Sequence, residues 1–224
     1  YRATSWDCVA MNRREELATN LASVQERIAS ANVTLIVVTK TYPVSDVQAL
    51  NELGVENFGE NRSEEGEVKA AAVPATWHFQ GGIQSRKIKD IVQWADVIHS
   101  LDSSEHALKI GQRAVRPIDV FLQLSLDGDP ERGGVVESEL AALAEVVVAT
   151  SNLTLAGLMC VPPVSAIAVD AFSQIYSVHQ RFLRDFPNAQ SLSTGMSGDF
   201  EVAIDHGATH IRVGSSILGS RTYR

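Results

Sequence analysis

The chain has 224 residues, which is enough for one large α/β domain or two small ones with a sizeable core. Its 45% hydrophobic and 21% charged residues are ordinary for a soluble globular protein, and a net charge of −8 leaves no basic surplus for nucleic acid or an anionic membrane. No apolar run approaches the roughly 20 residues that span a bilayer, and we expect no signal peptide.

An amphipathic helix is the first predicted element, over about residues 7–30. Leu17, Leu21, Val24 and Ile28 recur at steps of four, three and four, with polar residues between them. This spacing is typical of a helix that packs one apolar stripe against a core. Residues 1–6 are expected to be a disordered end or a remnant of expression.

The first predicted strand leads to Lys40. Residues 35–38 are four β-formers in a row, and Pro43 prevents the strand from continuing. A run that is apolar on both faces is typical of a buried parallel strand, so we expect the Lys40 amine at the end of a core strand. The alternative is that Lys40 only extends its amine into water. The other four lysines fall in stretches predicted as exposed helix, namely Lys69, Lys87, Lys89 and Lys109.

Strands and helices alternate over the rest of the chain. The further predicted strands cover residues 55–61, 76–80, 96–100, 117–124, 153–159, 190–193 and 209–213. The helices between them are predicted over residues 44–53, 62–72, 85–94, 103–115, 137–149, 165–186 and 199–206. Ser45 is expected to cap the first of these helices and Gly54 to end it. Eight strands that alternate with helices predict an α/β fold of one domain, residues 1–224, closed as a (β/α)8 barrel of the TIM type.

The C-terminal ends of the strands are where barrels of this type carry their working residues. This rule selects Lys40, Asn61, residues 78–80, Ser100, Met159, Ser193, Gly214 and Ser215. Residues 193–199 and 212–216, after the last two strands, are rich in glycine and serine. Small residues let a backbone approach a ligand, and free N–H groups and hydroxyls can hold an anion. Each loop alone could be an ordinary turn, but together they predict a phosphate cradle.

A phosphate site and a strand-end amine in one barrel suggest pyridoxal 5′-phosphate as the cofactor. Its aldehyde condenses with a lysine amine, and burial would lower the Lys40 pKa from about 10.4 and free that amine. Arg212 lies on the last strand, which neighbours the first in a closed barrel. A guanidinium that faces the ring nitrogen cannot give up its proton and would weaken the ring as an electron sink. The alternative is that Arg212 pairs with a carboxylate at the end of the barrel.

Short motifs along nearly the whole chain carry a resemblance to a known family. They are VTKT at residues 38–41, FGEN at 58–61, WHF at 77–79, QS at 84–85, GLM at 157–159, STGMS at 193–197, IRVG at 211–214 and GSR at 219–221. With this set the chain resembles the YggS/PROSC family of pyridoxal phosphate homeostasis proteins. The resemblance implies a single-domain barrel like the N-terminal domain of alanine racemase, with the cofactor held as a Schiff base on Lys40.

A set of cofactor-binding residues follows from the strand ends and the resemblance together. It comprises Lys40, Asn61, His78, Met159, Ser193, Met196, Ser197, Arg212, Gly214 and Ser215. Within it the resemblance implies phosphate contacts around Ser193, Ser197, Gly214 and Ser215, and a place for Arg212 near the ring nitrogen. The chain departs from the family at Gln80, where an aliphatic residue is more frequent, and at Thr194, which adds a hydroxyl to the presumed phosphate loop.

Three functions compete at this point. The first is binding and supply of the cofactor, for which the family is known, without established catalysis. The second is a racemase or a related enzyme that uses the cofactor. The third is a barrel aldolase that uses a lysine imine and a substrate phosphate, without a cofactor. A racemase needs a second acid or base. Racemases of this barrel type resemble one another in taking it from an added C-terminal domain, whereas this chain ends about ten residues after its last predicted strand. We therefore expect a binding protein with no catalytic residue.

Other sequence features give weaker indications. Cys8 and Cys160 lie far apart and form no disulfide framework, which favours a reducing cytoplasm. No set of histidines and cysteines has the spacing of a metal site. Glu60, Glu64, Glu65 and Glu67 are predicted to form a solvated helix face. The expected partners are the small-molecule cofactor and, in transient contacts, apo enzymes that need it. We expect no nucleic acid, no membrane and a monomeric state.

Overall fold

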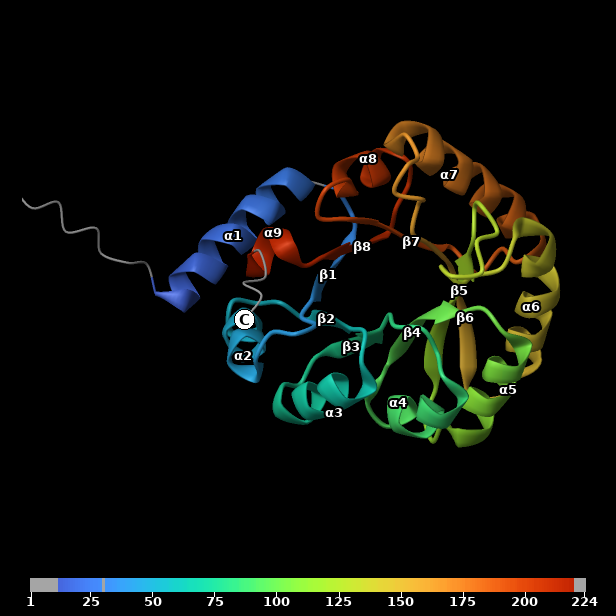
Figure 1. Ribbon diagram of the computed structural model, residues 1–224, viewed down its shortest axis with the longest axis horizontal. Coiled ribbons are helices and arrows are strands. Elements are labelled where there is room, and N and C mark those ends of the chain that lie inside the picture. Colours follow the sequence, from blue (N-terminus) through green and yellow to red (C-terminus); the bar gives the residue numbers. More distant parts are fainter. Residues whose placement is uncertain (1–11, 30, 220–224) are drawn as a thin grey trace, which may run out of the picture.

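A closed barrel of parallel strands forms the centre of the computed structural model, which describes residues 12–29 and 31–219 (Figure 1). Each strand pairs with the next along the chain, and the last pairs with the first, so that Ile36 lies opposite Arg212. The strands are β1 (Thr34–Val38), β2 (Asn57–Glu60), β3 (Thr76–Phe79), β4 (Val97–Leu101), β5 (Ile118–Leu124), β6 (Leu153–Cys160), β7 (Ser191–Met196) and β8 (His210–Val213). The predicted barrel is confirmed.

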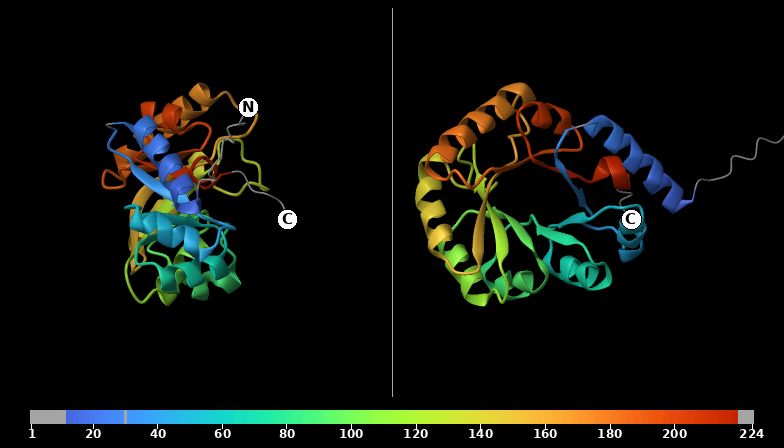
Figure 2. Two further views of the ribbon diagram at one scale, coloured as in Figure 1. Left: turned by 90° about the vertical axis from the view of Figure 1, so that its left-hand side faces the viewer. Right: turned by 180° about the vertical axis from the view of Figure 1, so that it is seen from behind.

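Helices surround the ring of strands in both opposite views (Figures 1 and 2). They are α1 (Arg13–Ile28), α2 (Val44–Glu52), α3 (Ser63–Ala72), α4 (Ile88–Trp94), α5 (Ser104–Arg113), α6 (Glu137–Ala149), α7 (Ala168–Asp185), α8 (Phe200–Asp205) and α9 (Ser215–Leu218), with a 3-10 turn at Ser85–Lys87. The first and the last helix, α1 and α9, pack side by side. No helix in the described ranges is long and apolar enough to cross a membrane.

Apolar packing between strands and helices holds the ring together. The main cluster joins strand residues such as Val37 and Phe58 to helix residues such as Leu17 and Leu50, all of which are buried. Strand β4 is buried along its whole length, as is typical of a parallel strand covered on both faces. A much smaller apolar cluster is centred on Phe121. The remaining buried groups of the strands include many polar ones, and several of these belong to the site.

Several element boundaries differ from the predicted ones. Strand β1 ends at Val38, so Lys40 lies in the following turn and not on the strand itself. Strand β7 extends to Met196, three residues beyond its predicted end. Pro43, not Ser45, is the N-cap of α2, although Gly54 follows that helix with a φ of 92° as expected. The predicted start of the first helix and residues 1–6 lie outside the described residues.

Strands β6 and β7 approach each other closely at Gly157. A Cβ atom at this position would lie 1.7 Å from the carbonyl oxygen of Ser191, its partner residue on β7. The contact is with backbone, so no side-chain rearrangement could relieve it. Only glycine lets the two strands pair at this point.

Candidate functional site

A cavity of about 490 Å³ lies at the C-terminal ends of the strands, which is within the range of about 300–1,000 Å³ usual for small-molecule sites. The first, second, third, sixth, seventh and eighth strand ends contribute to its wall. Its lining residues are Val38, Lys40, Tyr42, Asn61, Gln80, Met159, Val161, Met196, Ser197, Gly198, Arg212, Gly214, Ser215 and Gly219. All the predicted site residues except His78 and Ser193 are therefore brought to one cavity.

Lys40 lies on a tight turn between β1 and α2 and is half-buried. The turn is closed by a hydrogen bond of 3.0 Å from the Tyr42 N–H to the Thr39 carbonyl. Thr41 adopts a φ of 71°, a left-handed conformation that is costly for a β-branched residue. The expected buried amine at a strand end is thus corrected to a half-buried amine on a strained turn at the cavity wall.

The loops after β7 and β8 are joined by the hydroxyl of Ser197. This oxygen accepts hydrogen bonds from the N–H groups of Gly214, at 3.2 Å, and Ser216, at 3.4 Å. Both bonds are long, so an anion with several acceptor oxygens could replace the hydroxyl. A Cβ at Gly214 would lie 3.1 Å from the carbonyl oxygen of Val38, which shows how closely this loop approaches the first strand. The predicted phosphate cradle therefore has its loops in place.

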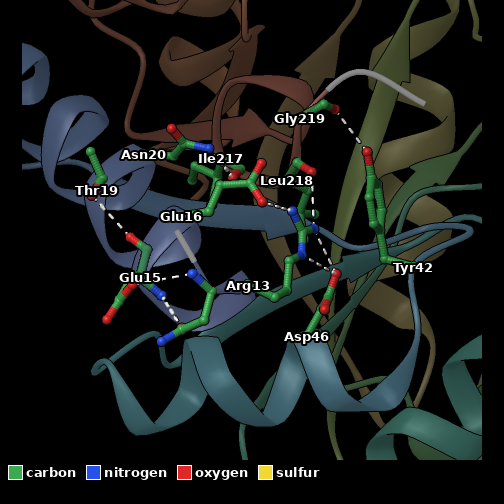
Figure 3. Close-up of polar contacts among 11 residues, drawn as sticks. Arg13, Glu15, Glu16, Thr19, Asn20, Tyr42, Asp46, Ile217, Leu218 and Gly219 are labelled. Atoms are coloured by element: carbon green, nitrogen blue, oxygen red, sulfur yellow. Dashed lines mark hydrogen bonds and ion pairs between the residues drawn. The ribbon is translucent and has the colours of Figure 1, made fainter. Parts of the chain in front are cut away.

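Helix α9, which carries the second loop of this cradle, is anchored at its carbonyl end by α1 (Figure 3). The Arg13 guanidinium donates to the Leu218 carbonyl at 3.0 Å and pairs with the Asp46 carboxylate of α2 at 2.7 Å. The Asn20 amide donates to the Ile217 carbonyl at 3.0 Å. A helix this short has little stability of its own, so these side chains fix its position.

The turn that carries Lys40 also contacts α9. The Tyr42 hydroxyl donates to the Gly219 carbonyl at 2.8 Å, and Figure 3 shows the ring between the two segments. Arg13 lies about 5.8 Å from the centre of the Tyr42 ring. The lysine turn is therefore linked to the C-terminal end of α9, the helix whose first turn belongs to the cradle. Helix α9 was not predicted, because its four residues are too short for a sequence period.

Arg212 is buried beneath the cavity. Its guanidinium donates to the carbonyl of Ser193 at 2.8 Å, to the Ser193 hydroxyl at 2.6 Å and to the Cys160 carbonyl at 3.1 Å. Burial lowers the pKa of Arg212 to about 10. Among the described residues its hydrogen bonds go to neutral oxygens, and no carboxylate forms an ion pair with it. A buried cation without a carboxylate partner suits a ligand acceptor in the cavity.

A chain of hydrogen bonds runs from Arg212 through the inside of the barrel. It passes from Ser193 Oγ to His99 Nδ1 at 3.0 Å, from His99 Nε2 to His78 Nδ1 at 2.9 Å and from His78 Nε2 to Asn57 Oδ1 at 3.0 Å. Arg212 can only donate and Asn57 Oδ1 can only accept, so every donor points the same way along the chain. His78 and Ser193 therefore support Arg212 from below and do not line the cavity, in contrast to their predicted place in the site.

The histidines inside the barrel titrate far below their usual range. Burial lowers the pKa of His78 to about 3 and, with the charge of Arg212, the pKa of His210 to about 4. It also lowers the pKa of His99 well below its usual value. An unfolded histidine has a pKa of about 6.5. The folded protein therefore keeps these imidazoles neutral in a range where the unfolded chain protonates them.

The free energy of unfolding should consequently fall as the pH drops from about 6.5 toward 4. In this window the unfolded chain binds more protons, which costs up to about 1.4 kcal/mol per pH unit for each histidine. Urea unfolding at pH 7, 6 and 5 measures this slope. The variant His210→Gln, which lacks one such group, should show a shallower slope below pH 6. Equal slopes in the two proteins would contradict this assignment.

Two polar atoms at the cavity have no hydrogen-bond partner among the described residues. They are Asn61 Oδ1 and Gln80 Nε2, which are both buried and lie on residues that line the cavity. A buried amide group without a partner is costly, and a ligand in the cavity could supply what is missing. Asn61 was predicted as a site residue. Gln80 was selected only by its place at a strand end and by its departure from the family.

Thr194 does not belong to the cradle, although its hydroxyl was expected in the phosphate loop. The side chain is buried and donates to the Cys160 carbonyl at 3.0 Å. Because β7 extends to Met196, Ser193 and Thr194 are strand residues, and the cradle begins only at Ser197.

In the described part of the chain, no group of three or more histidine, cysteine, aspartate or glutamate side chains is placed to hold a metal ion.

A buried ion pair lies next to the lysine turn, and no sequence pattern predicted it. Lys69 is only 4% exposed and pairs with Glu60, which is fully buried on β2. The predictions of an exposed Lys69 and of a solvated face that includes Glu60 are therefore wrong. The sequence does contain an indication that Lys69 is buried. Ser63 and Gly66 precede it at steps of three, and these small residues mark a tightly packed helix face.

The chain is similar to proteins of a known family. Residues 13–222 match the family described as the N-terminal domain of alanine racemase. A pyridoxal phosphate homeostasis protein of Corynebacterium glutamicum is 42% identical, over 85% of this chain and 91% of that protein. One of Mycobacterium leprae is 36% identical, over 95% of this chain and 96% of that protein.

Solved structures with a similar fold include PipY and an alanine racemase. PipY of Synechococcus elongatus, solved with and without pyridoxal phosphate, is 31% identical over 91% of this chain and the whole of that chain. Its TM-scores are 0.83 with the cofactor bound and 0.85 without it. Alanine racemase of Corynebacterium glutamicum, at 14% identity and a TM-score of 0.73, shares the barrel fold, and the match covers 60% of that longer chain.

Proposed function

The chain belongs to the pyridoxal phosphate homeostasis proteins, a family with the alanine racemase N-terminal fold, and from this membership we propose that it binds pyridoxal 5′-phosphate and takes part in the intracellular supply of this cofactor. The cofactor is held as a Schiff base on Lys40. The observation that carries the proposal is that Lys40, the loops joined by Ser197 and the buried Arg212 all meet at one cavity.

The residues at the cavity fit the parts of this cofactor. The Lys40 amine suits the aldehyde, and the loop N–H groups of Gly214 and Ser216 suit the phosphate. Arg212 suits a neutral acceptor such as the ring nitrogen, because it cannot pass on its proton. The unpartnered amide atoms of Asn61 and Gln80 could bond polar substituents of the ring. Met159 and Met196 form apolar parts of the wall.

Binding without fast turnover is the second part of the proposal. When bound, the cofactor supplies an electrophilic carbon and an electron-withdrawing ring. The described lining residues include no carboxylate, imidazole or thiol, and the Tyr42 hydroxyl is engaged with the Gly219 carbonyl. Arg212 leaves the ring nitrogen without a proton and so weakens the ring as an electron sink. A cavity wall without such an acid or base, and a ring that is a weak electron sink, both disfavour proton transfer to and from a bound amino acid.

The proposal also covers the location, the oligomeric state and the partners of the protein. We infer a cytoplasmic, monomeric protein whose single domain, residues 1–224, hands the cofactor to apo enzymes in transient contacts. The transfer of the cofactor is supported by the relatives' name, pyridoxal phosphate homeostasis protein, and by a cavity that opens at the C-terminal ends of the strands. The acidic balance of the chain is consistent with partners other than nucleic acid.

Chemical trapping tests the proposal directly. The purified protein, incubated with pyridoxal 5′-phosphate, should develop a visible absorption band that borohydride bleaches, because reduction fixes the cofactor on its lysine. Peptide mapping should then find the modification at Lys40. A protein that stays colourless, or a label at Lys69, Lys87, Lys89 or Lys109, would overturn the assignment. A sample treated with borohydride before the cofactor is added serves as the control.

A further inference from the structure

The turn that carries Lys40 is held from behind by a second, buried lysine. Lys69 of α3 donates through Nζ to the Thr39 carbonyl at 2.8 Å, the residue immediately before Lys40. The same Nζ contacts Glu60 Oε1 at 2.5 Å and Glu65 Oε2 at 3.5 Å. An ammonium group has three hydrogens, and these three acceptors use them all. Lys69 is therefore fully engaged in holding its neighbours.

The residue after Lys40 is held by the same group of side chains. The Thr41 N–H donates to Glu65 Oε2 at 2.6 Å, and this is the residue whose φ of 71° is strained. A strained conformation of about 1–3 kcal/mol persists only where its surroundings fix it. The Glu65 carboxylate supplies that fixation, and Lys69 in turn contacts the same carboxylate oxygen.

Charge and burial give this group its rigidity. Burial raises the pKa of Glu60, while hydrogen bonds from Lys69 and from the Thr39 hydroxyl, at 2.6 Å, oppose that rise. Burial alone would also raise the pKa of Glu65, but the Thr41 N–H and Lys69 lower it. Pairs of this kind in a dry environment have few alternative arrangements, because any other would leave a charge unpaired.

We propose that Lys69, acting through Glu65 and the backbone on both sides of Lys40, is a positioning residue that holds the Lys40 amine in place for its reaction with the cofactor. The inference rests on the proposed function. In that reaction the amine nitrogen adds to the aldehyde carbon, and the aldehyde oxygen leaves as water when the C=N bond forms. A displacement of about 1 Å at a reacting group can cost about 100-fold in rate, so the turn must be held precisely.

Two measurements separate positioning from a general structural role. The first is the rate at which the visible band appears after mixing with pyridoxal 5′-phosphate. The second is the affinity for pyridoxine 5′-phosphate, which keeps the ring and the phosphate but has an alcohol in place of the aldehyde. In Glu65→Ala, and in Lys69→Met combined with Glu60→Gln, the rate should fall by about 10- to 100-fold. The affinity for the analogue should stay within about twofold of the wild-type value.

The variants are chosen so that each result decides the question. Glu60→Gln avoids a buried unpaired carboxylate, and Glu65 is 24% exposed, so its replacement leaves the core intact. Glu65→Gln keeps an oxygen that can accept from Thr41 and should restore most of the rate. Lys87→Met removes a lysine that pairs with Glu64 on the surface and should match the wild type.

The outcomes for this inference and for the proposed function differ. Wild-type rates in both the Glu65→Ala and the Lys69→Met/Glu60→Gln proteins would overturn the positioning role, while the wild type still forms its visible band on Lys40. An equal loss of rate and of analogue affinity would also overturn it, because it would indicate general damage to the site. Failure of the wild-type protein to bind the analogue or to form the band would instead reject the proposed function.

Discussion

Replacing Lys40 by alanine should abolish the visible band completely while leaving a cavity that still binds the non-covalent analogue. The cradle around Ser197 follows β7, and the guanidinium of Arg212 comes from β8, so neither belongs to the turn that carries Lys40. We expect the apparent affinity for pyridoxal 5′-phosphate to fall by at least about 100-fold, which corresponds to about 3 kcal/mol. The affinity for pyridoxine 5′-phosphate should change by less than about threefold. Absorption spectra and equilibrium titration measure both quantities.

A matched control for this variant is Lys89→Ala. Lys89 lies on α4 with a side chain that is 67% exposed, and it does not line the cavity. This variant should keep the band and both affinities. A visible, borohydride-sensitive band in Lys40→Ala would show that another amine carries the cofactor. Loss of analogue binding in Lys40→Ala alone would show that the lysine holds the ring or the phosphate as well as the aldehyde.

Replacing Gly157 by alanine should lower the free energy of unfolding much more than the same replacement at Gly82. The new Cβ would lie 1.7 Å from the Ser191 carbonyl oxygen, and the nearest atoms all belong to backbone. Overpacking of a core usually costs about 1–3 kcal/mol, and here strand β7 would have to move away from β6. We expect the free energy of unfolding to fall by about 3 kcal/mol or more in urea denaturation.

Gly82→Ala is the appropriate comparison for this substitution. No atom lies within 4 Å of a Cβ at Gly82, so the same added methyl group should change the free energy of unfolding by less than about 0.5 kcal/mol. A Gly157→Ala protein within about 1 kcal/mol of the wild type would show that the two strands can separate at little cost. It would also remove the structural reason for glycine in the GLM motif.

The architecture could be predicted because its signals are local and repeated. Alternating strands and helices specify a parallel barrel, and closure then places β8 beside β1 without further information. The rule that working residues follow the strand ends selected Lys40, Asn61 and Gly214, and the structure brings these three residues to one cavity. Each of these residues was recognised by its place in an element, and that place depends only on nearby sequence.

The buried polar contacts could not be predicted, because they join residues that are distant in the sequence, and local patterns do not report such pairings. Lys69 looks like a surface lysine, since a charged residue on a short helix is normally solvated. Only the fold brings the Glu60 carboxylate and the Thr39 carbonyl to it. In the same way, Ser193 was assigned to the phosphate from the family resemblance and from a strand that was predicted to end three residues too early. Its actual partner, Arg212, comes from the neighbouring strand.

The contacts between α1 and α9 have a consequence for how the protein is made. Arg13 and Leu218 are 205 positions apart in the chain, and Tyr42 and Gly219 are 177 apart. A ribosome synthesises the N-terminal partner of each contact first and adds the other about 180 to 200 residues later. The first helix therefore forms its contacts with Ile217 and Leu218 only after those residues have been synthesised. Under the proposed function, Lys40 leaves the ribosome well before Gly214 and Ser216 of the cradle, so we expect the cofactor to load only after α9 has been synthesised.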